Sequence, residues 1–147
     1  MVSERKTRDQ VLRLVREGRA TLEIALAGAP EDDATKAMLA HVMHWEQVMV
    51  QWLGGTSPPI SWLGEIDRTN AAVAAHHSSR PFADVRREFD AVHRDLLRRV
   101  EALSDDELNR ALRPGETVWT KIGDETWFHY PEHVAQLEAR ARTSGKG

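Results

Sequence analysis

The chain has 147 residues, 41% of them hydrophobic and 29% charged, which predicts one globular domain over residues 1–147 with its own core. A net charge of -3 argues against nucleic-acid binding through a broad basic surface, and the absence of cysteine excludes disulfides and thiol nucleophiles and leaves nitrogen and oxygen atoms as metal ligands. The N-terminus is charged and no apolar run approaches the ~20 residues of a membrane span, so we expect a cytoplasmic protein with no membrane partner.

Two amphipathic helices are predicted in the first third of the chain. Thr7 and Gln10 have the spacing of a capping box, which starts a first helix over about residues 7–27. A second helix begins at Asp33 or Thr35 and ends at a pair of glycines. The spacing of its apolar residues alternates between four and three, as in a helix of a bundle: Met38, Val42, Trp45, Met49 and Trp52.

The middle of the chain predicts a long crossover followed by the clearest helix. The crossover covers residues 54–80 and contains a shorter helical segment at residues 63–79. The next helix opens at Ser79, with Pro81 in its first turn, where a proline is well tolerated. Its apolar residues keep the helical period as far as Leu103.

The last third of the chain predicts a short helical turn and then a long final helix. Ser104 and Glu107 form a second possible capping box. The final helix has apolar residues at helical spacing from Trp119 to Leu137, and the tail at residues 143–147 is expected to be disordered. No segment shows the alternation of a strand. We therefore predict an all-α protein, an antiparallel four-helix bundle with a longer crossover between its second and third helices.

Two histidines four residues apart lie on the inner side of this final helix. With about 100° of rotation per residue, His133 falls within about 20° of the centre of the apolar face and His129 within about 60°. Side chains at this spacing can both reach one metal ion. Pro131 lies between them, and the apolar period favours a continuous helix with a kink. If Pro131 lies in a first turn instead, His129 falls at or before the N-cap, which weakens the argument from a shared face.

A catalytic metal site needs a third protein ligand from another helix. His41 lies about 60° from the centre of the apolar stripe of its helix, and His44 lies about 120° away, so His41 is the favoured candidate. His93 borders the stripe of its own helix and is held in reserve. His76 and His77, at a helix end, are expected to be exposed. Histidine pairs at helical spacing also occur by chance, as surface residues or as hydrogen-bonded core residues.

Other side chains near the histidines are candidates for supporting roles. Glu125 precedes His129 by one turn and could orient its ring. Tyr130, the one tyrosine, could donate a hydrogen bond to a ligand, or it could lie at the edge of the core. Trp45 and Trp119, together with two further tryptophans, are candidates to line an apolar pocket, although simple core packing is the plainer interpretation.

Three segments together resemble the DinB/YfiT-like superfamily of four-helix bundle proteins, and in particular its ClbS/DfsB-type branch. Members of the superfamily commonly hold a divalent metal, often nickel or zinc, on three histidines from the second and last helices. The resemblance implies His41, His129 and His133 as the ligands, with His44 as an alternative to His41. ClbS-like members can lack this triad, so their activity is not implied. The segments are LAHVMHWEQVMVQWL (39–53), the stretch from IDRTN to SDDEL (66–108) and IGDETWFHYPEHVAQLEA (122–139).

The function predicted from these observations is that of a metal-dependent enzyme. Three imidazoles leave coordination positions open, which is the layout of a catalytic site. The protein would be a hydrolase or a thiol-dependent transferase acting on a small electrophilic molecule, and any low-molecular-weight thiol would come from outside the chain. Two alternatives remain: a non-catalytic bundle that sequesters a toxic small molecule, and a structural dimer without metal. We also expect a homodimer, as in related bundles.

Overall fold

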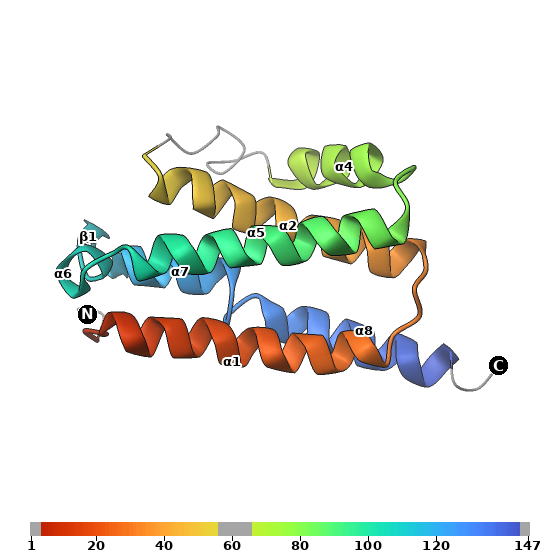
Figure 1. Cartoon of the computed structure of the whole chain (residues 1–147), viewed down its shortest axis with the longest axis horizontal. Helices are drawn as coiled ribbons and strands as arrows, with labels where there is room; N and C mark the ends of the chain where they lie inside the picture. Colours follow the sequence, from red (N-terminus) through yellow and green to blue (C-terminus); the bar gives the residue numbers. More distant parts are fainter. Residues whose placement is uncertain (1–3, 56–65, 145–147) are drawn as a thin grey trace.

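The computed structural model describes residues 4–55 and 66–144 and is helical along most of that length. The predicted all-α fold is confirmed: the long helices lie side by side as a bundle, with a small sheet at one end (Figure 1). The elements, in chain order, are α1 (Arg8–Ala27), α2 (Asp33–Leu53), α4 (Ile66–His77), α5 (Phe82–Glu101), α6 (Asp105–Leu108), β1 (Ala111–Arg113), β2 (Glu116–Thr117), α7 (Val118–Glu125) and α8 (Tyr130–Ser144).

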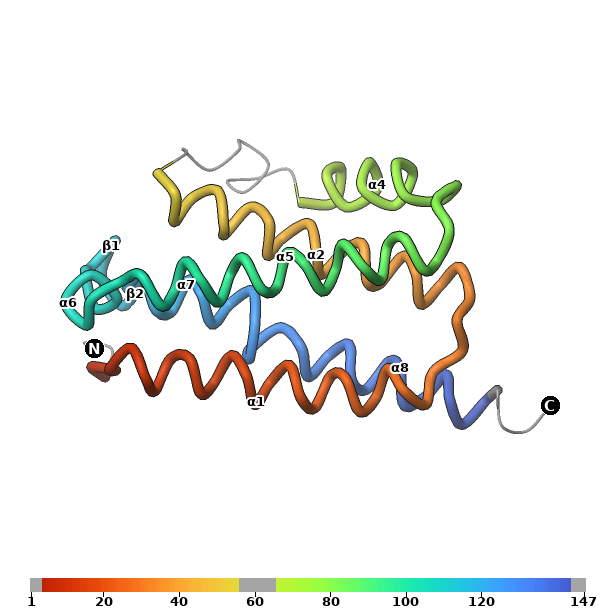
Figure 2. The backbone as a smooth tube through the Cα atoms, in the orientation of Figure 1, coloured from red at the N-terminus to blue at the C-terminus, as the bar shows by residue number. Residues whose placement is uncertain are grey.

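The bundle consists of two helix pairs. α2 packs mainly against α5, and α8 packs mainly against α1. Figure 2 shows that α1 and α8 run in one direction along the bundle and that α2 and α5 run in the other. The crossover makes this arrangement possible, because α4 returns the chain to the end of the bundle at which α2 began. We call the boundary between the pairs α2–α5 and α1–α8 the seam.

Side-chain caps determine where the first helices begin. Thr7 Oγ1 accepts a hydrogen bond from the Gln10 amide at 3.2 Å, and Gln10 Oε1 accepts one from the Thr7 amide at 2.8 Å, which confirms the first capping box. Asp32 caps α2 by accepting a hydrogen bond from the Thr35 amide at 3.0 Å. The second capping box is also present, at the start of α6. These local contacts explain why the sequence located three helix starts correctly.

The end of the crossover differs from the prediction. α4 ends at His77 and α5 begins at Phe82, whereas we predicted a start at Ser79. Pro81 occupies the N-cap position with non-helical backbone angles, φ -58° and ψ 143°. A proline disfavours helical geometry in the residue before it, which excludes a helix that runs from Ser79 through Arg80 into Pro81. Residues 56–65 of the predicted crossover lie outside the described residues.

Two further corrections concern the second half of the chain. The prediction of no strand was wrong, because β1 and β2 form an antiparallel pair in which Ala111 lies opposite Thr117. Their turn contains Gly115 at φ 79°, a backbone angle that glycine adopts without strain. At the C-terminal end, α8 extends to Ser144. The tail that we predicted to be disordered, residues 143–147, therefore overlaps the last two residues of α8, and residues 145–147 lie outside the described part of the chain.

The predicted final helix is in fact two helices, α7 and α8, and Figure 2 shows the chain stepping sideways between them. Pro131 lies in the first turn of α8, where its missing N–H has no helical partner to lose. A continuous helix would have placed the proline ring against a carbonyl one turn earlier. The prediction of one kinked helix was wrong, and the alternative, in which His129 precedes the helix, is what the structure has.

The buried side chains form two apolar clusters, one toward each end of the bundle. A polar layer described below falls between them along the helices. The first cluster is built around Leu22, Leu39, Met43, Phe89 and Leu137. The second is built around Val15, Met49, Leu96, Val100, Trp119 and Ile122.

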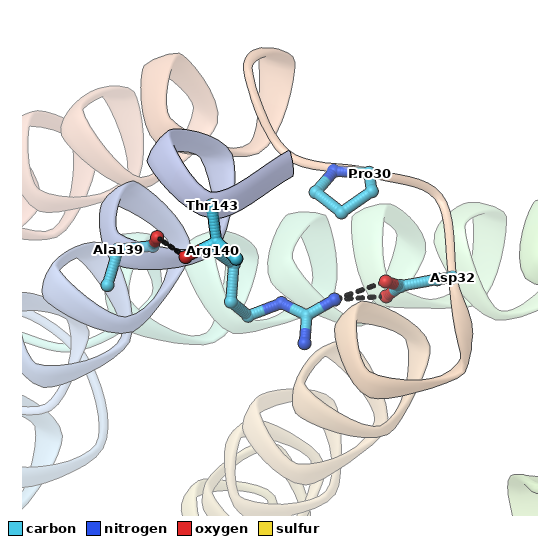
Figure 3. A pocket seen from close by; sticks show the side chains of 5 residues that line it. All are labelled: Pro30, Asp32, Ala139, Arg140 and Thr143. Carbon is cyan, nitrogen blue, oxygen red and sulfur yellow. Dashed lines mark hydrogen bonds and ion pairs between the residues drawn. The ribbon is translucent and has the colours of Figure 1, made fainter. Parts of the chain in front are cut away.

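One end of the bundle is closed by a contact between distant parts of the chain. The Arg140 guanidinium on α8 pairs with both carboxylate oxygens of Asp32, beside Pro30 and Thr143, in a pocket of about 370 Å³ (Figure 3). The Thr35 amide, aided by Arg140, holds the pKa of Asp32 below its ordinary value.

Among the described helices, none combines the length and the apolarity needed to cross a membrane.

Candidate metal centre

The structure brings His41, His129 and His133 together at the seam. His41 lies in α2, His129 is the last residue before α8, and His133 follows one turn into α8. The Nε2 atoms of His41 and His129 are 3.2 Å apart, and those of His133 and His129 are 2.9 Å apart. One nitrogen from each of the three rings lies within 4.8 Å of the others. His133 is buried, and the other two are half-buried.

His129 lies in the folded linker between α7 and α8. Its position therefore does not result from the four-residue spacing within a continuous helix. The amides of His129 and Tyr130 both donate to the carbonyl of Thr126, at 2.9 Å each. Thr126 is fully buried, and its hydroxyl donates to the carbonyl of Ile122 at 2.7 Å. These bonds bend the chain between α7 and α8. The break therefore does not separate the two imidazoles, contrary to the weakening that we expected for a helix starting at Pro131.

Two glycines that the sequence analysis did not consider allow the linker to pack closely. A Cβ atom on Gly123, in α7, would lie 2.7 Å from the Trp127 ring and 2.9 Å from the Phe128 ring. A Cβ atom on Gly18, in α1, would lie 3.1 Å from the Tyr130 ring. The signal that could have revealed them was present, because glycine inside a helical pattern often marks a close approach of another segment.

Burial favours the neutral forms of His41 and His129. Burial, with the nearby His133 and His41 rings, lowers the pKa of His129 to about 4, and interaction with the main chain of Glu125 opposes this shift. Burial and the neighbouring His133 also lower the pKa of His41. The Nδ1 atom of His133 lies 3.0 Å from Oε1 of Gln136, which can only accept a hydrogen bond. This acceptor favours the tautomer of His133 that carries its proton on Nδ1 and has a lone pair at Nε2.

The three nitrogens fit a metal ion. Ligand atoms about 2.0–2.1 Å from one ion, at angles of roughly 90° to 105°, lie about 2.9–3.3 Å from each other. The His41–His129 and His133–His129 separations, 3.2 and 2.9 Å, fall in this range. Neutral imidazoles are the protonation state that a metal requires. The donor set of three nitrogens suits zinc, nickel, copper and iron alike.

The other histidines do not join the triad. His44 packs edge-on against Trp45, with ring centroids 5.1 Å apart. His93 is buried, and its Nδ1 lies 2.8 Å from Oε1 of Glu46. His76 is exposed, as predicted, but the predicted exposure of His77 was wrong. His77 is buried at the end of α4, where its Nδ1 lies 2.9 Å from the Arg80 guanidinium.

A cavity of about 310 Å³ opens beside the triad. Trp45 lines it, and its indole N–H donates to Asn70 Oδ1 at 2.9 Å. Its polar wall is formed by Lys121, Asp124 and Glu125 of α7, and partial burial raises the pKa of the Asp124 carboxyl. The lining residues are His41, Trp45, Ile66, Lys121, Asp124, Glu125 and His129.

Of the remaining candidates, Trp119 and Tyr130 lie away from this cavity and Glu125 lines it. Trp119 stacks on Trp127, with ring centroids 6.3 Å apart, and packs in the second apolar cluster instead of lining this cavity. Tyr130 is almost completely buried, and its hydroxyl lies 3.5 Å from Nδ1 of His93. Glu125 lines the cavity and acts on His129 through its main chain. Of the predicted pocket residues, Trp45 and Glu125 therefore border the site directly.

Comparison with known sequences identifies the family. A model of the DinB superfamily matches residues 15–137, which include all three site histidines. The chain belongs to the DinB superfamily. A crystal structure of an uncharacterised protein from Escherichia coli UTI89 is similar to this DinB protein, with a TM-score of 0.82, 15% sequence identity and 95% of each chain covered. At that identity the likeness shows a shared fold. No curated protein matches the chain.

Proposed function

We propose that this DinB superfamily protein binds a divalent metal ion on His41, His129 and His133 and uses it in a reaction on a small electrophilic molecule. The observation that carries the proposal is the convergence of three imidazole nitrogens from opposite sides of the seam, beside a cavity of about 310 Å³. Members of this superfamily often bind metal, which supports the assignment. Nickel and zinc are the proposed ions.

The chain's own residues would prepare the site in three ways. Gln136 holds the proton of His133 on Nδ1, which leaves Nε2 as a ligand. Burial favours the neutral forms of His41 and His129. A metal bound here would make a water molecule or an external thiol more acidic and would polarise the electrophile. Because the chain has no cysteine, a thiol transferase would need a low-molecular-weight thiol as cosubstrate.

The cavity wall supplies groups for the substrate. Trp45 and Ile66 offer apolar surface, and Lys121 carries a positive charge. Asp124 has a raised pKa because of burial, so its carboxylate is suited to accept a proton from a bound water or thiol. A hydrolase and a thiol-dependent transferase would both use these groups. The sequence segments described above support a place near the ClbS/DfsB-type branch, but the triad argues for a reaction that uses metal.

A sequestering function has less support from the described residues. It requires a cavity lined by tryptophans, and Trp45 is the one described tryptophan beside the triad. Trp119 packs in the second apolar cluster, and the half-buried Trp127 stacks on it away from the triad. The metal-dependent reaction is therefore the function that the site supports best.

Elemental analysis of protein purified without an affinity tag tests the proposal. We expect about one nickel or zinc ion per chain, lost in the double variant His129→Ala/His133→Ala and retained in His76→Ala, which removes an exposed histidine outside the triad. Metal-loaded and chelated proteins would then be compared on a panel of electrophiles with and without thiols. A protein that takes up no metal after supplementation with several divalent ions would refute the proposal.

A further inference from the structure

A cluster of polar side chains lies at the centre of the bundle, where apolar packing would be expected. It contains Arg19 of α1, Glu46 of α2, His93 of α5 and Tyr130 of α8, one residue from each long helix. None of the four is more than 7% exposed. We call this group the central polar cluster. Buried ionisable groups are costly unless they are paired, so their presence in all four helices needs an explanation.

The members contact one another across the seam. His93 Nδ1 donates to Glu46 Oε1 at 2.8 Å, and the Tyr130 hydroxyl lies 3.5 Å from the same nitrogen. Arg19 Nη1 lies 3.8 Å from Glu46 Oε2. α2 and α5 belong to one helix pair, and α1 and α8 belong to the other. The Glu46–Arg19 and His93–Tyr130 contacts therefore join the two pairs.

Arg19 is held in place by further contacts. Its Nε donates to Glu23 at 2.7 Å, and its Nη2 donates to Asp90 at 3.1 Å. Its guanidinium lies over the Phe89 ring, 3.7 Å from the centroid. Arg19 thus has one fixed orientation, and it presents its remaining edge toward Glu46. A cation anchored in this way fixes the position of a buried carboxylate more tightly than a mobile surface residue would.

The cluster lies next to the site histidines along the chain. Tyr130 directly follows His129, and Glu46 lies in α2 five residues after His41. Like the cluster, the triad spans the seam, because His41 belongs to the α2–α5 pair and His133 to the α1–α8 pair. Apolar contacts between helices have no preferred direction, whereas a hydrogen bond between charged groups does, such as the one that Arg19 of α1 donates across the seam to Asp90 of α5. The cluster is therefore suited to set the relative position of the two pairs.

We propose that the central polar cluster is a positioning device for the histidine triad, in which Glu46 and Tyr130 hold α2 and the start of α8 at the separation that brings the three imidazoles together. This inference rests on the proposed metal site. The cluster residues do not touch the metal or the substrate. They act through the helices that carry His41, His129 and His133.

The test compares metal affinity with stability in four variants. Tyr130→Phe removes one hydroxyl, Glu46→Leu removes the carboxylate, and Glu46→Gln keeps an oxygen that can accept from His93. Val100→Ala, in the second apolar cluster, is the matched control, because it removes buried apolar contacts without touching the polar cluster. The Kd for nickel or zinc is measured by competition with a chelator, and the free energy of unfolding of metal-free protein is measured in urea.

We expect Tyr130→Phe and Glu46→Leu to weaken metal affinity about tenfold or more, the scale seen when groups that orient metal ligands are removed. Glu46→Gln should recover most of the affinity. Val100→Ala should lose stability but keep its Kd. If Kd changes in proportion to unfolding free energy across all four variants, or if Tyr130→Phe and Glu46→Leu leave it unchanged, the positioning role is wrong.

A second measurement separates this inference from the proposed function. Nuclear Overhauser contacts between the rings of His41, His129 and His133 are recorded in metal-free protein. We expect Tyr130→Phe and Glu46→Leu to weaken these contacts and Val100→Ala to preserve them. If wild-type protein binds no metal but shows this pattern, the proposed function fails and the positioning role stands. If the ring contacts persist in both cluster variants, the positioning role fails whatever the metal content.

Discussion

At the scale of single residues, the position of His129 depends on side chains that never touch it. Gly123 leaves room for the Trp127 and Phe128 rings, and Thr126 ties the linker back to α7. Main-chain hydrogen bonds within the linker then position His129 at the seam. The geometry of the candidate site is therefore sensitive to changes in the linker and in the surface of α7 on which it packs.

Gly123→Ala should disturb this packing. The new methyl group would lie 2.7 Å from the Trp127 ring, so the linker must move. We expect a loss of roughly 1–3 kcal/mol in unfolding free energy, the usual cost of overpacking, and a reduced metal content. Urea unfolding and elemental analysis measure the two effects. Gly28→Ala is the control, because its nearest neighbour would be 3.9 Å away. A Gly123→Ala protein equal to wild type in both measurements would contradict this account.

Gln136 should influence metal binding without contacting the metal. Its Oε1 accepts a hydrogen bond from Nδ1 of His133, which leaves Nε2 available as a ligand. We expect Gln136→Leu to weaken the metal Kd about tenfold, measured by chelator competition. Gln136→Glu keeps an acceptor at the same place and should retain tight binding. Equal affinities in the leucine and glutamate variants would show that the hydrogen bond does not orient His133.

At the scale of helices, the sequence pattern located most elements because caps and apolar periods are local properties. The pattern wrongly predicted one continuous helix where the structure has α7 and α8, and the reason is physical. Trp119 and Ile122 in α7 and Leu137 in α8 are all buried, so the apolar period continues across a break in the backbone. Periodicity alone cannot distinguish a continuous helix from two helices that share a buried face. Pro131 was the signal that favoured the break.

Pro131→Ala tests whether the proline is needed for that break. In a first turn, proline loses no helical hydrogen bond, so its replacement should change the unfolding free energy by no more than about 1 kcal/mol. The linker bonds from Thr126 should keep α8 starting at the same place, and the metal content should stay that of wild type. Urea unfolding and elemental analysis provide the readouts. A large gain in stability with loss of metal would mean that alanine lets α7 and α8 fuse.

The contact between α1 and α5 should make stability depend on pH. Burial alone would raise the pKa of Glu23, but hydrogen bonds from Arg86 and Arg19 hold it below the ordinary value of 4.5. The ionised carboxylate therefore stabilises the folded state above that pH, and this contribution disappears as the pH falls through the lowered pKa. Glu23→Gln should be less stable than wild type at pH 7, and the difference should shrink in acid. Urea unfolding at pH 7 and pH 3.5 measures it, and a difference that grows in acid would contradict the assignment.

At the scale of the whole molecule, the sequence predicted the bundle because amphipathic helices of this length must bury their apolar faces against one another. It could not show which helices would pair or where the seam would lie, because those features depend on contacts between distant segments. His41 was favoured over His44 from its angle in α2 alone, and the structure places His41 at the triad. The central polar cluster was missed because its members are separated widely in sequence and each looks unremarkable in its own helix.

Metal binding should stabilise the entire bundle, because the proposed ligands come from both helix pairs. A ligand that binds only the folded state at about 100 times its Kd adds about 2.7 kcal/mol. We expect thermal unfolding of wild type to shift upward with nickel or zinc and downward with a chelator. His129→Ala/His133→Ala should show neither shift. An identical response in that double variant would place the stabilising ion elsewhere on the protein.

The ion pair at the end of the bundle links the last helix to the first residues of α2. Asp32 caps the helix that carries His41, and Arg140 of α8 forms an ion pair with the same carboxylate. Shortening the chain at its C-terminal side, before Arg140, would therefore loosen the beginning of α2 even though every site histidine would still be present. Truncated versions of this protein should fray at a helix more than one hundred residues away from the cut.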